Sequence, residues 1–182
     1  MEWTLPGTVT AVPLATAPEI DSYMKAMFLA GGLTLGQVTE FTGLSPNDIQ
    51  NWVKRGFLSP PRGKRYTIEQ VCRILHISLL RGALPLESIK ALLGYINGDL
   101  VDDRDDIIND SQLYFMFVRL AAQAREHNSP ESWEKALDAV MADYIEPLPG
   151  AAERVRKALR VMLTAWFAAK MRQEAEKMLA EL

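Results

Sequence analysis

The chain has 182 residues, of which 48% are hydrophobic and 24% charged, and its formal net charge is −3. This length and composition predict a folded protein made of one domain with an extension or of two small domains. No segment approaches the roughly 20 apolar residues that cross a bilayer, and a single cysteine cannot form a disulfide within the chain. We therefore expect a cytoplasmic protein with no membrane partner.

The first part of the chain predicts an arm followed by a helix. Residues 1–17 lack the basic start of a signal peptide and are interrupted by Pro6 and Pro13, so we expect an extended N-terminal arm. Apolar residues then recur at helical spacing from about Pro18 to Leu29, before a pair of glycines breaks the pattern. This pattern predicts a helix that packs on the core.

The next segment carries two short helical patterns separated by a glycine turn. Thr34 and Gln37 have the spacing of a capping box at the start of the first helix, and Gly43 ends that helix. Ser45 is placed to cap a second helix, and Gly56 is placed to end it with a positive φ. Two helices joined by a tight turn are typical of a helix-turn-helix unit.

Polar side chains form one stripe of the second helix, at positions i, i+3, i+4 and i+7: Asn47, Gln50, Asn51 and Lys54. Amides of this kind can pair with an adenine edge in the major groove, while Lys54 and Arg55 suit guanine or phosphate. Any amphipathic helix also presents a polar face to solvent. The stripe alone therefore leaves both interpretations open.

A basic loop after the second helix favours DNA. Its prolines and glycine predict a short two-stranded wing, from which four side chains project: Arg62, Lys64, Arg65 and Tyr66. The residues from Lys54 to Arg65 include five basic side chains and no acidic one, which would neutralise phosphates. Residues 31–93 carry eight Lys and Arg against four Asp and Glu, so the positive field is local.

The residues after the wing predict two helices that complete a domain over residues 18–96. Thr67 and Gln70 repeat the capping-box spacing, and Pro85 begins the second helix. Residues 97–111 are rich in Asp but lack the alternating acids and closing Glu of a calcium loop. We expect an acidic linker there, and no metal or cofactor, because the histidine and the cysteine of the preceding helices stand alone.

The C-terminal region, residues 112–182, is predicted to be a helical bundle. Ser129 starts a helix, and a final helix runs from about Ala151 to Leu182 with a length of roughly 45 to 50 Å. A helix of that length suggests packing on another subunit in a homodimer, although folding back on the preceding helices is an open alternative. A pocket among these helices would accept a small-molecule effector.

Several of these motifs resemble a known family of regulators. The resemblance to the N-terminal domain of MerR-type regulators rests on Thr34–Val38, Thr42–Ser45, Gly56–Leu58, Pro61, Lys64–Thr67 and Val71. A narrower resemblance, to the bacterial family called domain of unknown function 1836, covers roughly residues 18 to 120 and rests on Pro18–Ile20, Tyr23–Met24, Ile49–Lys54, Lys64–Tyr66 and Asp105–Ile108. The MerR resemblance implies a winged helix-turn-helix that binds operator DNA as a dimer, with bases contacted by the second helix and phosphates by the wing.

Together the patterns predict a mainly α fold, in which a MerR-like winged helix-turn-helix with a small β wing precedes a C-terminal helical bundle. The predicted function is a transcriptional regulator that binds double-stranded DNA. Two alternatives use the same scaffold: a helical protein-interaction module, and an architectural or excisionase-like DNA-binding protein. An enzyme is the weakest option, because the chain has no phosphate loop and no paired acid-base motif.

Overall fold

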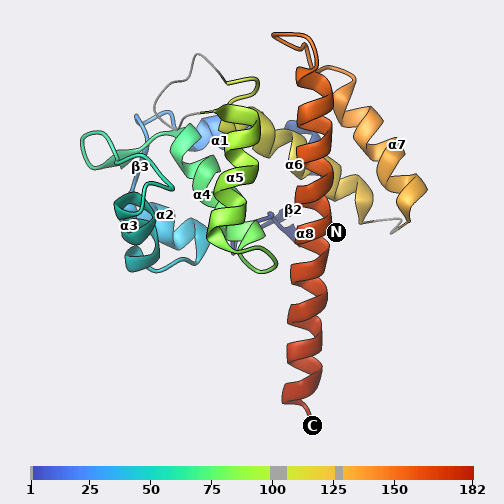
Figure 1. Ribbon diagram of the computed structural model, residues 1–182. Helices are drawn as coiled ribbons and strands as arrows, with labels where there is room; N and C mark the ends of the chain where they lie inside the picture. Colours follow the sequence, from blue (N-terminus) through green and yellow to red (C-terminus); the bar gives the residue numbers. More distant parts are fainter. Residues whose placement is uncertain (1, 99–105, 126–128) are drawn as a thin grey trace.

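The computed structural model describes residues 2–98, 106–125 and 129–182, and it is mainly helical, as the sequence predicts (Figure 1). Eight α-helices lie in the described residues: α1 (Ile20–Met27), α2 (Leu35–Thr42), α3 (Pro46–Lys54), α4 (Ile68–Leu80), α5 (Leu86–Asn97), α6 (Asp110–Ala124), α7 (Pro130–Met141) and α8 (Ala151–Ala180). Two antiparallel pairs of short strands accompany them: β1 (Glu2–Thr4) with β2 (Ala11–Pro13), and β3 (Leu33–Thr34) with β4 (Arg65–Tyr66).

The predicted helix starts are confirmed by their caps. The Thr34 side chain accepts a hydrogen bond from the Gln37 backbone, and Thr67 does the same with Gln70, so both capping boxes form. Ser129 also caps its helix as expected. These short polar pairs satisfy backbone donors that the first turn of a helix leaves free, which is why sequence locates them well.

The extended N-terminal arm is a wrong prediction. Strands β1 and β2 form a hairpin in which Trp3 lies opposite Val12, and a 3-10 helix, η1 (Leu14–Glu19), continues from it into α1. Trp3, Leu5 and Val12 are buried, and the Tyr114 hydroxyl of α6 donates to the Pro6 carbonyl at 2.9 Å. The alternation of inward apolar residues over so few positions is too short a signal to distinguish from a loop.

One hydrophobic core is shared by the two regions that the sequence predicts as separate, residues 18–96 and 112–182. Helix α4 lies in the centre, and one continuous hydrophobic cluster includes residues of α2, α3, α4, α6 and α8. Residues 99–105 of the predicted acidic linker lie outside the described residues. The described part of that segment, from residue 106 on, is not a solvent-exposed linker, because Ile107 and Ile108 are buried in the same cluster.

Helix α8 begins after a left-handed Gly150 and folds back on the body over its first part. Val155, Leu159 and Met162 are fully buried there. Beyond Ala169 every residue of the helix is exposed, and Figure 1 shows this end of α8, drawn in red, projecting past the other helices. No helix among the described residues is long and apolar enough to cross a membrane.

Candidate nucleic-acid interface

The interface is built on the α2–α3 pair. Gly43 ends α2 in the left-handed conformation, with φ at 72°, and the chain turns directly into α3. Ser45 caps α3, its hydroxyl accepting from the Asp48 backbone, and Pro46 occupies the first turn, where a missing N–H costs nothing. Because Ile49 and Trp52 are buried against the core, the opposite side of α3 is fixed toward solvent.

The predicted polar stripe lies on that solvent side. All of its members are exposed, together with the residue that follows them: Asn47, Gln50, Asn51, Lys54 and Arg55. The three amides make no side-chain hydrogen bond with any described residue. The stripe is therefore available to an external partner, and burial of the apolar side prevents α3 from rotating it inward.

Of the predicted two-stranded wing, the basic loop forms a tight hairpin with a single bridged residue pair, Arg62 with Arg65. Arg62 and Arg65 exchange backbone hydrogen bonds of 3.1 and 3.0 Å around a two-residue turn. Gly63 and Lys64 in this turn have φ of 55° and 63°, and positive φ at both central positions is the mark of a type I′ hairpin. Strand β4 then pairs with β3, which immediately precedes α2, so the hairpin is anchored to the start of the helix pair.

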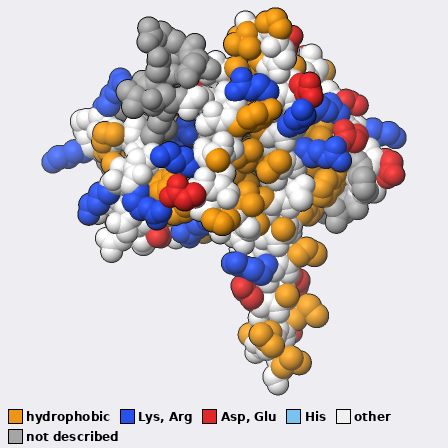
Figure 2. All heavy atoms as spheres, in the orientation of Figure 1, with side chains coloured by type: hydrophobic (Ala, Val, Ile, Leu, Met, Phe, Trp, Pro, Cys, Tyr) orange, Lys and Arg blue, Asp and Glu red, His pale blue; other side chains and the backbone are white. Residues whose placement is uncertain are grey.

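The basic side chains of α3 and the hairpin differ in whether they contact a partner within the chain. Lys54, Arg62 and Lys64 are exposed and pair with no carboxylate in the described part of the chain. Arg65 donates to the Gly32 carbonyl at 2.7 Å, and Arg55 pairs with an exposed Glu87 at 3.2 Å. Figure 2 shows Lys and Arg side chains, in blue, gathered over the end that carries α3 and the hairpin, with few acidic side chains, in red, among them.

The predicted exposure of Tyr66 is wrong. Its side chain is only 3% exposed and belongs to the core, and burial raises the pKa of its phenol. In a strand, successive side chains point to opposite faces, so Tyr66 turns inward when its neighbour Arg65 turns outward. Tyr66 therefore supports the hairpin from beneath and is not placed to grip a phosphate.

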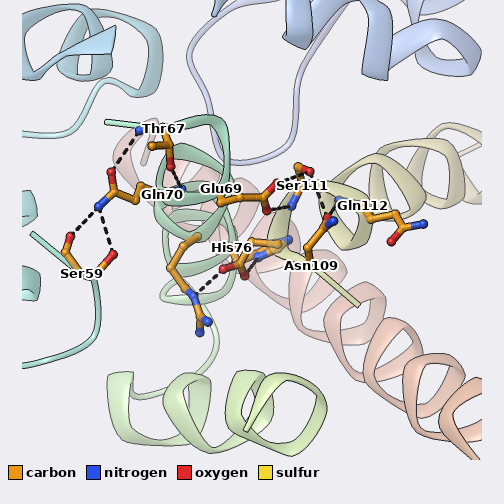
Figure 3. A network of polar contacts seen from close by, with 10 residues as sticks. Ser59, Thr67, Glu69, Gln70, His76, Asn109, Ser111 and Gln112 are labelled. Carbon is orange, nitrogen blue, oxygen red and sulfur yellow. Dashed lines mark hydrogen bonds and ion pairs between the residues drawn. The ribbon is translucent and has the colours of Figure 1, made fainter. Parts of the chain in front are cut away.

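Gln70 has a role that the sequence does not reveal. Its side-chain oxygen completes the α4 capping box, and its Nε2 donates to the Ser59 carbonyl at 3.0 Å (Figure 3). The same Nε2 donates to the Pro60 carbonyl at 2.9 Å. The side chain is 8% exposed. One amide thus fixes the start of the basic loop to the central helix.

A second group of polar contacts joins α4 to the beginning of α6 (Figure 3). Glu69 accepts from both the backbone and the hydroxyl of Ser111, each at 2.7 Å, and so satisfies free donors at the α6 N-terminus. Arg73 Nε lies 2.9 Å from Asp110, and His76 Nδ1 lies 3.4 Å from the same carboxylate. These contacts connect the helix that supports the hairpin to the C-terminal helices.

The charges of this group explain the state of Asp110. Burial raises the pKa of its carboxyl, but the adjacent His76 and Arg73 outweigh that effect and hold the pKa below its ordinary value. Cys72 lies on α4, one helical turn before His76, and is fully buried. Burial together with nearby Glu69 raises the pKa of its thiol well above the ordinary range. The thiol is thereby held in its protonated form, as expected of a side chain buried in the core.

The described residues contain no group of three or more His, Cys, Asp and Glu side chains that could hold a metal ion. A surface hollow of about 1030 Å³ lies beside the network, with Pro60, Arg73 and Tyr144 in its walls. A second hollow, of about 870 Å³, lies between α1, α6 and α7. The sequence allows for an effector pocket among these helices, and that expectation stays a prediction.

Comparison with known proteins identifies the family. The model of a family described as a domain of unknown function, DUF1836, matches residues 13–117 of the chain. A relative from Bacillus subtilis (strain 168), described as uncharacterized protein YkrK, is 26% identical over 160 residues, which cover 81% of this chain and 69% of the relative. No solved structure gives a significant match. Because the family model covers more than half of the chain, including the α2–α3 pair and the hairpin, the protein belongs to the DUF1836 family.

Proposed function

We propose that the protein is a DNA-binding transcriptional regulator whose α2–α3 pair and hairpin act as a MerR-like winged helix-turn-helix. The observation that carries the proposal is the combination of an exposed polar stripe on α3 with hairpin cations that pair with no described carboxylate. Figure 1 places both features at the same end of the molecule. Such cations favour a polyanionic partner, because their charge is not already neutralised by the described part of the chain.

In this proposal α3 enters the major groove, which is wide enough to admit a helix. Asn47, Gln50 and Asn51 contact base edges, where an amide can make two hydrogen bonds to adenine. Lys54 at the end of the helix reaches guanine or a phosphate. Arg55 lies beside it and can exchange its exposed partner Glu87 for DNA, because a surface ion pair of this kind contributes little free energy.

The hairpin contributes the phosphate contacts. Arg62 and Lys64 project from the turn, and Arg65 holds the Gly32 carbonyl with one nitrogen while its side chain stays exposed. Gln70 fixes the loop in place, which reduces the conformational entropy that binding would otherwise cost. The roles differ from the sequence expectation only at Tyr66, which positions the hairpin from the core.

The test is the salt dependence of DNA affinity. Binding of the full chain to double-stranded DNA is measured by fluorescence anisotropy from low to moderate salt, for the native protein and for Arg62→Ala, Lys64→Ala and Arg65→Ala combined. Each lost phosphate contact lowers the slope of log K against log salt by about 0.9, so the triple variant should lose about 2 to 3 units of slope.

The matched control removes three cations elsewhere on the surface: Lys25→Ala, Lys135→Ala and Lys177→Ala combined. It changes net charge by the same amount, so the native affinity should persist if the hairpin makes the contact. Equal loss in both variants would indicate nonspecific attraction. No DNA binding by the native protein would instead favour an interaction module, and binding without sequence preference would favour an architectural role.

A further inference from the structure

A third surface hollow, of about 710 Å³, lies where α8 leaves the other helices. Trp166 and side chains of the next three turns of α8 form one wall, and the loop that follows β1 forms the opposite wall (Figure 1). None of the described residues in these walls belongs to α3 or to the basic hairpin. A hollow of this volume has the usual size of a site for a small organic molecule.

Both walls are held in place by close packing around α4. The loop after β1 lies so near this helix that a side chain at Gly7 would place its Cβ 2.6 Å from the Leu75 carbonyl oxygen. Just after the end of the same helix, a Cβ at Gly82 would lie 2.7 Å from that of Ala169 on α8. The walls are therefore formed before any molecule binds, which lowers the entropy that binding costs.

The charged side chains in the walls leave two positive charges without a counter-charge. They are Arg125, Lys170, Glu174 and Lys177. Glu174 lies 3.7 Å from Lys177, so the charges of these two side chains offset each other. Arg125 and Lys170 pair with no carboxylate in the part of the chain that the structure describes. Two such cations in one concave surface attract an anion, because the protein walls focus their field.

Each of the two cations lies over an indole ring. The Arg125 guanidinium is 5.4 Å from the ring centroid of Trp3, and the Lys170 ammonium is 3.9 Å from that of Trp166. These contacts orient the cations but do not neutralise them. Partial burial, and then the charge of Arg125, lower the pKa of Lys170, so the two cations lie near enough to repel each other. An anion between them would relieve this repulsion.

We propose that this hollow is a binding site for a small organic anion, a carboxylate attached to an apolar body. The carboxylate lies between Arg125 and Lys170, where both cations donate charge-assisted hydrogen bonds to its oxygens. The body lies against the apolar part of the walls, which includes Leu79 and Met171. The ligand therefore needs both a negative charge and carbon atoms beyond the charged group. Binding at this site does not depend on a contact with DNA.

The first test compares three probes by isothermal titration calorimetry with the full chain. Octanoate has both the charge and the apolar body, octanamide has the body without the charge, and inorganic phosphate has a charge without the body. We expect octanoate to bind one molecule per chain, and the other two probes to bind more weakly by about tenfold or more. Equal binding of octanamide, equal binding of phosphate, or no binding of octanoate would overturn the proposal.

The second test locates the site with variants of one lysine. Lys170→Met keeps the apolar length of the side chain but removes its charge, and it should weaken octanoate binding by about tenfold or more. Lys170→Arg keeps the charge and should bind octanoate nearly as tightly as the native chain. The matched control, Lys157→Met, removes an exposed cation of the same helix outside the hollow, and it should leave the affinity unchanged.

Both lysines are exposed, so we expect the variants to fold, which circular dichroism checks. Native affinity in Lys170→Met, or an equal loss in Lys157→Met, would contradict a site between Arg125 and Lys170. All of these measurements use protein without DNA, so their failure is distinct from failure of the proposed DNA contact.

Discussion

The cations of the hairpin end and the cations that hold the C-terminal helices in place are used in opposite ways. Arg156 on α8 lies 2.7 Å from both Glu134 and Asp138, and buried Arg73 on α4 holds Asp110 of α6. At the other end of the molecule, Arg62 and Lys64 face solvent with no carboxylate partner among the described residues. Removing a cation of the first kind should therefore weaken the fold, whereas removing one of the second kind should weaken only the binding of an anion.

The largest expected effect on stability is at the buried pair. Asp110→Asn leaves the Arg73 charge without its carboxylate, and breaking one side of a buried pair costs about 3 to 5 kcal/mol. We expect a loss of that order in the free energy of unfolding, measured by urea denaturation at pH 7. The control is Asp138→Asn, whose carboxylate is 70% exposed. Equal losses in the two variants would contradict the distinction between buried and surface pairs.

The same pair predicts a pH dependence. The pKa of Asp110 is lower in the folded than in the unfolded state, so the folded carboxyl binds fewer protons. Its stabilisation is complete above the ordinary Asp value of 3.8 and declines as the pH falls through the lower folded pKa. Urea denaturation between pH 6 and pH 3 should show a steeper acid loss of stability for the native chain than for Asp110→Asn. Parallel curves would exclude this role.

Replacing Gln70 is expected to reduce both the stability of the fold and the affinity for DNA. Gln70→Leu removes the donor that holds Ser59 and Pro60 and leaves their carbonyls without that partner, a loss of about 1 to 3 kcal/mol in unfolding free energy. Because the basic loop loses its anchor, DNA affinity should fall as well. Ser129→Ala removes a capping side chain at α7, away from the loop, and should reduce stability with a smaller effect on binding.

A base contact should change specificity without changing the fold. Asn51→Ala removes an exposed amide with no partner in the described residues, so thermal unfolding should be unchanged. If Asn51 contacts a base, discrimination at that base pair should fall by about 1 to 3 kcal/mol, measured by competition with single-substituted DNA sites. Unchanged discrimination for both Asn51→Ala and Gln50→Ala would exclude base recognition by the middle of α3.

The smallest effect is expected at the surface network of α8. Arg156→Ala breaks two pairs of a side chain that is 32% exposed, and exposed pairs contribute about 0.2 to 1 kcal/mol each. Stability should fall slightly, and DNA affinity should not change. A loss of DNA affinity comparable to that of the hairpin variant would remove the difference between the two ends of the molecule.

Local signals account for what the sequence predicts correctly. The capping pair of Thr34 with Gln37, and the polar stripe of α3, involve residues three or four apart, and their physics is complete within one or two turns of helix. The hairpin turn at Gly63 and Lys64 is local in the same way. Because these features depend on near neighbours alone, the amino-acid sequence is enough to predict most of the candidate interface.

Long-range pairings account for what the sequence does not predict. Strand β3 exists only because Leu33 pairs with Tyr66, and the same pairing fixes which side of β4 turns inward. The β1–β2 hairpin is held by contacts such as that between Tyr114 and Pro6, more than a hundred residues apart. A strand of two or three residues has too little periodicity to be recognised, so its register depends on partners that the sequence pattern does not identify.

The most direct test of the proposed function is capture of sheared genomic DNA from the organism that encodes the protein, followed by sequencing. The purified native chain is compared at moderate salt with the folded variant that carries Arg62→Ala, Lys64→Ala and Arg65→Ala. We expect the native protein to enrich one or a few sites and the variant to lose them. No enrichment by the native protein, or equal enrichment by the variant, would contradict a regulator that binds DNA through α3 and the hairpin.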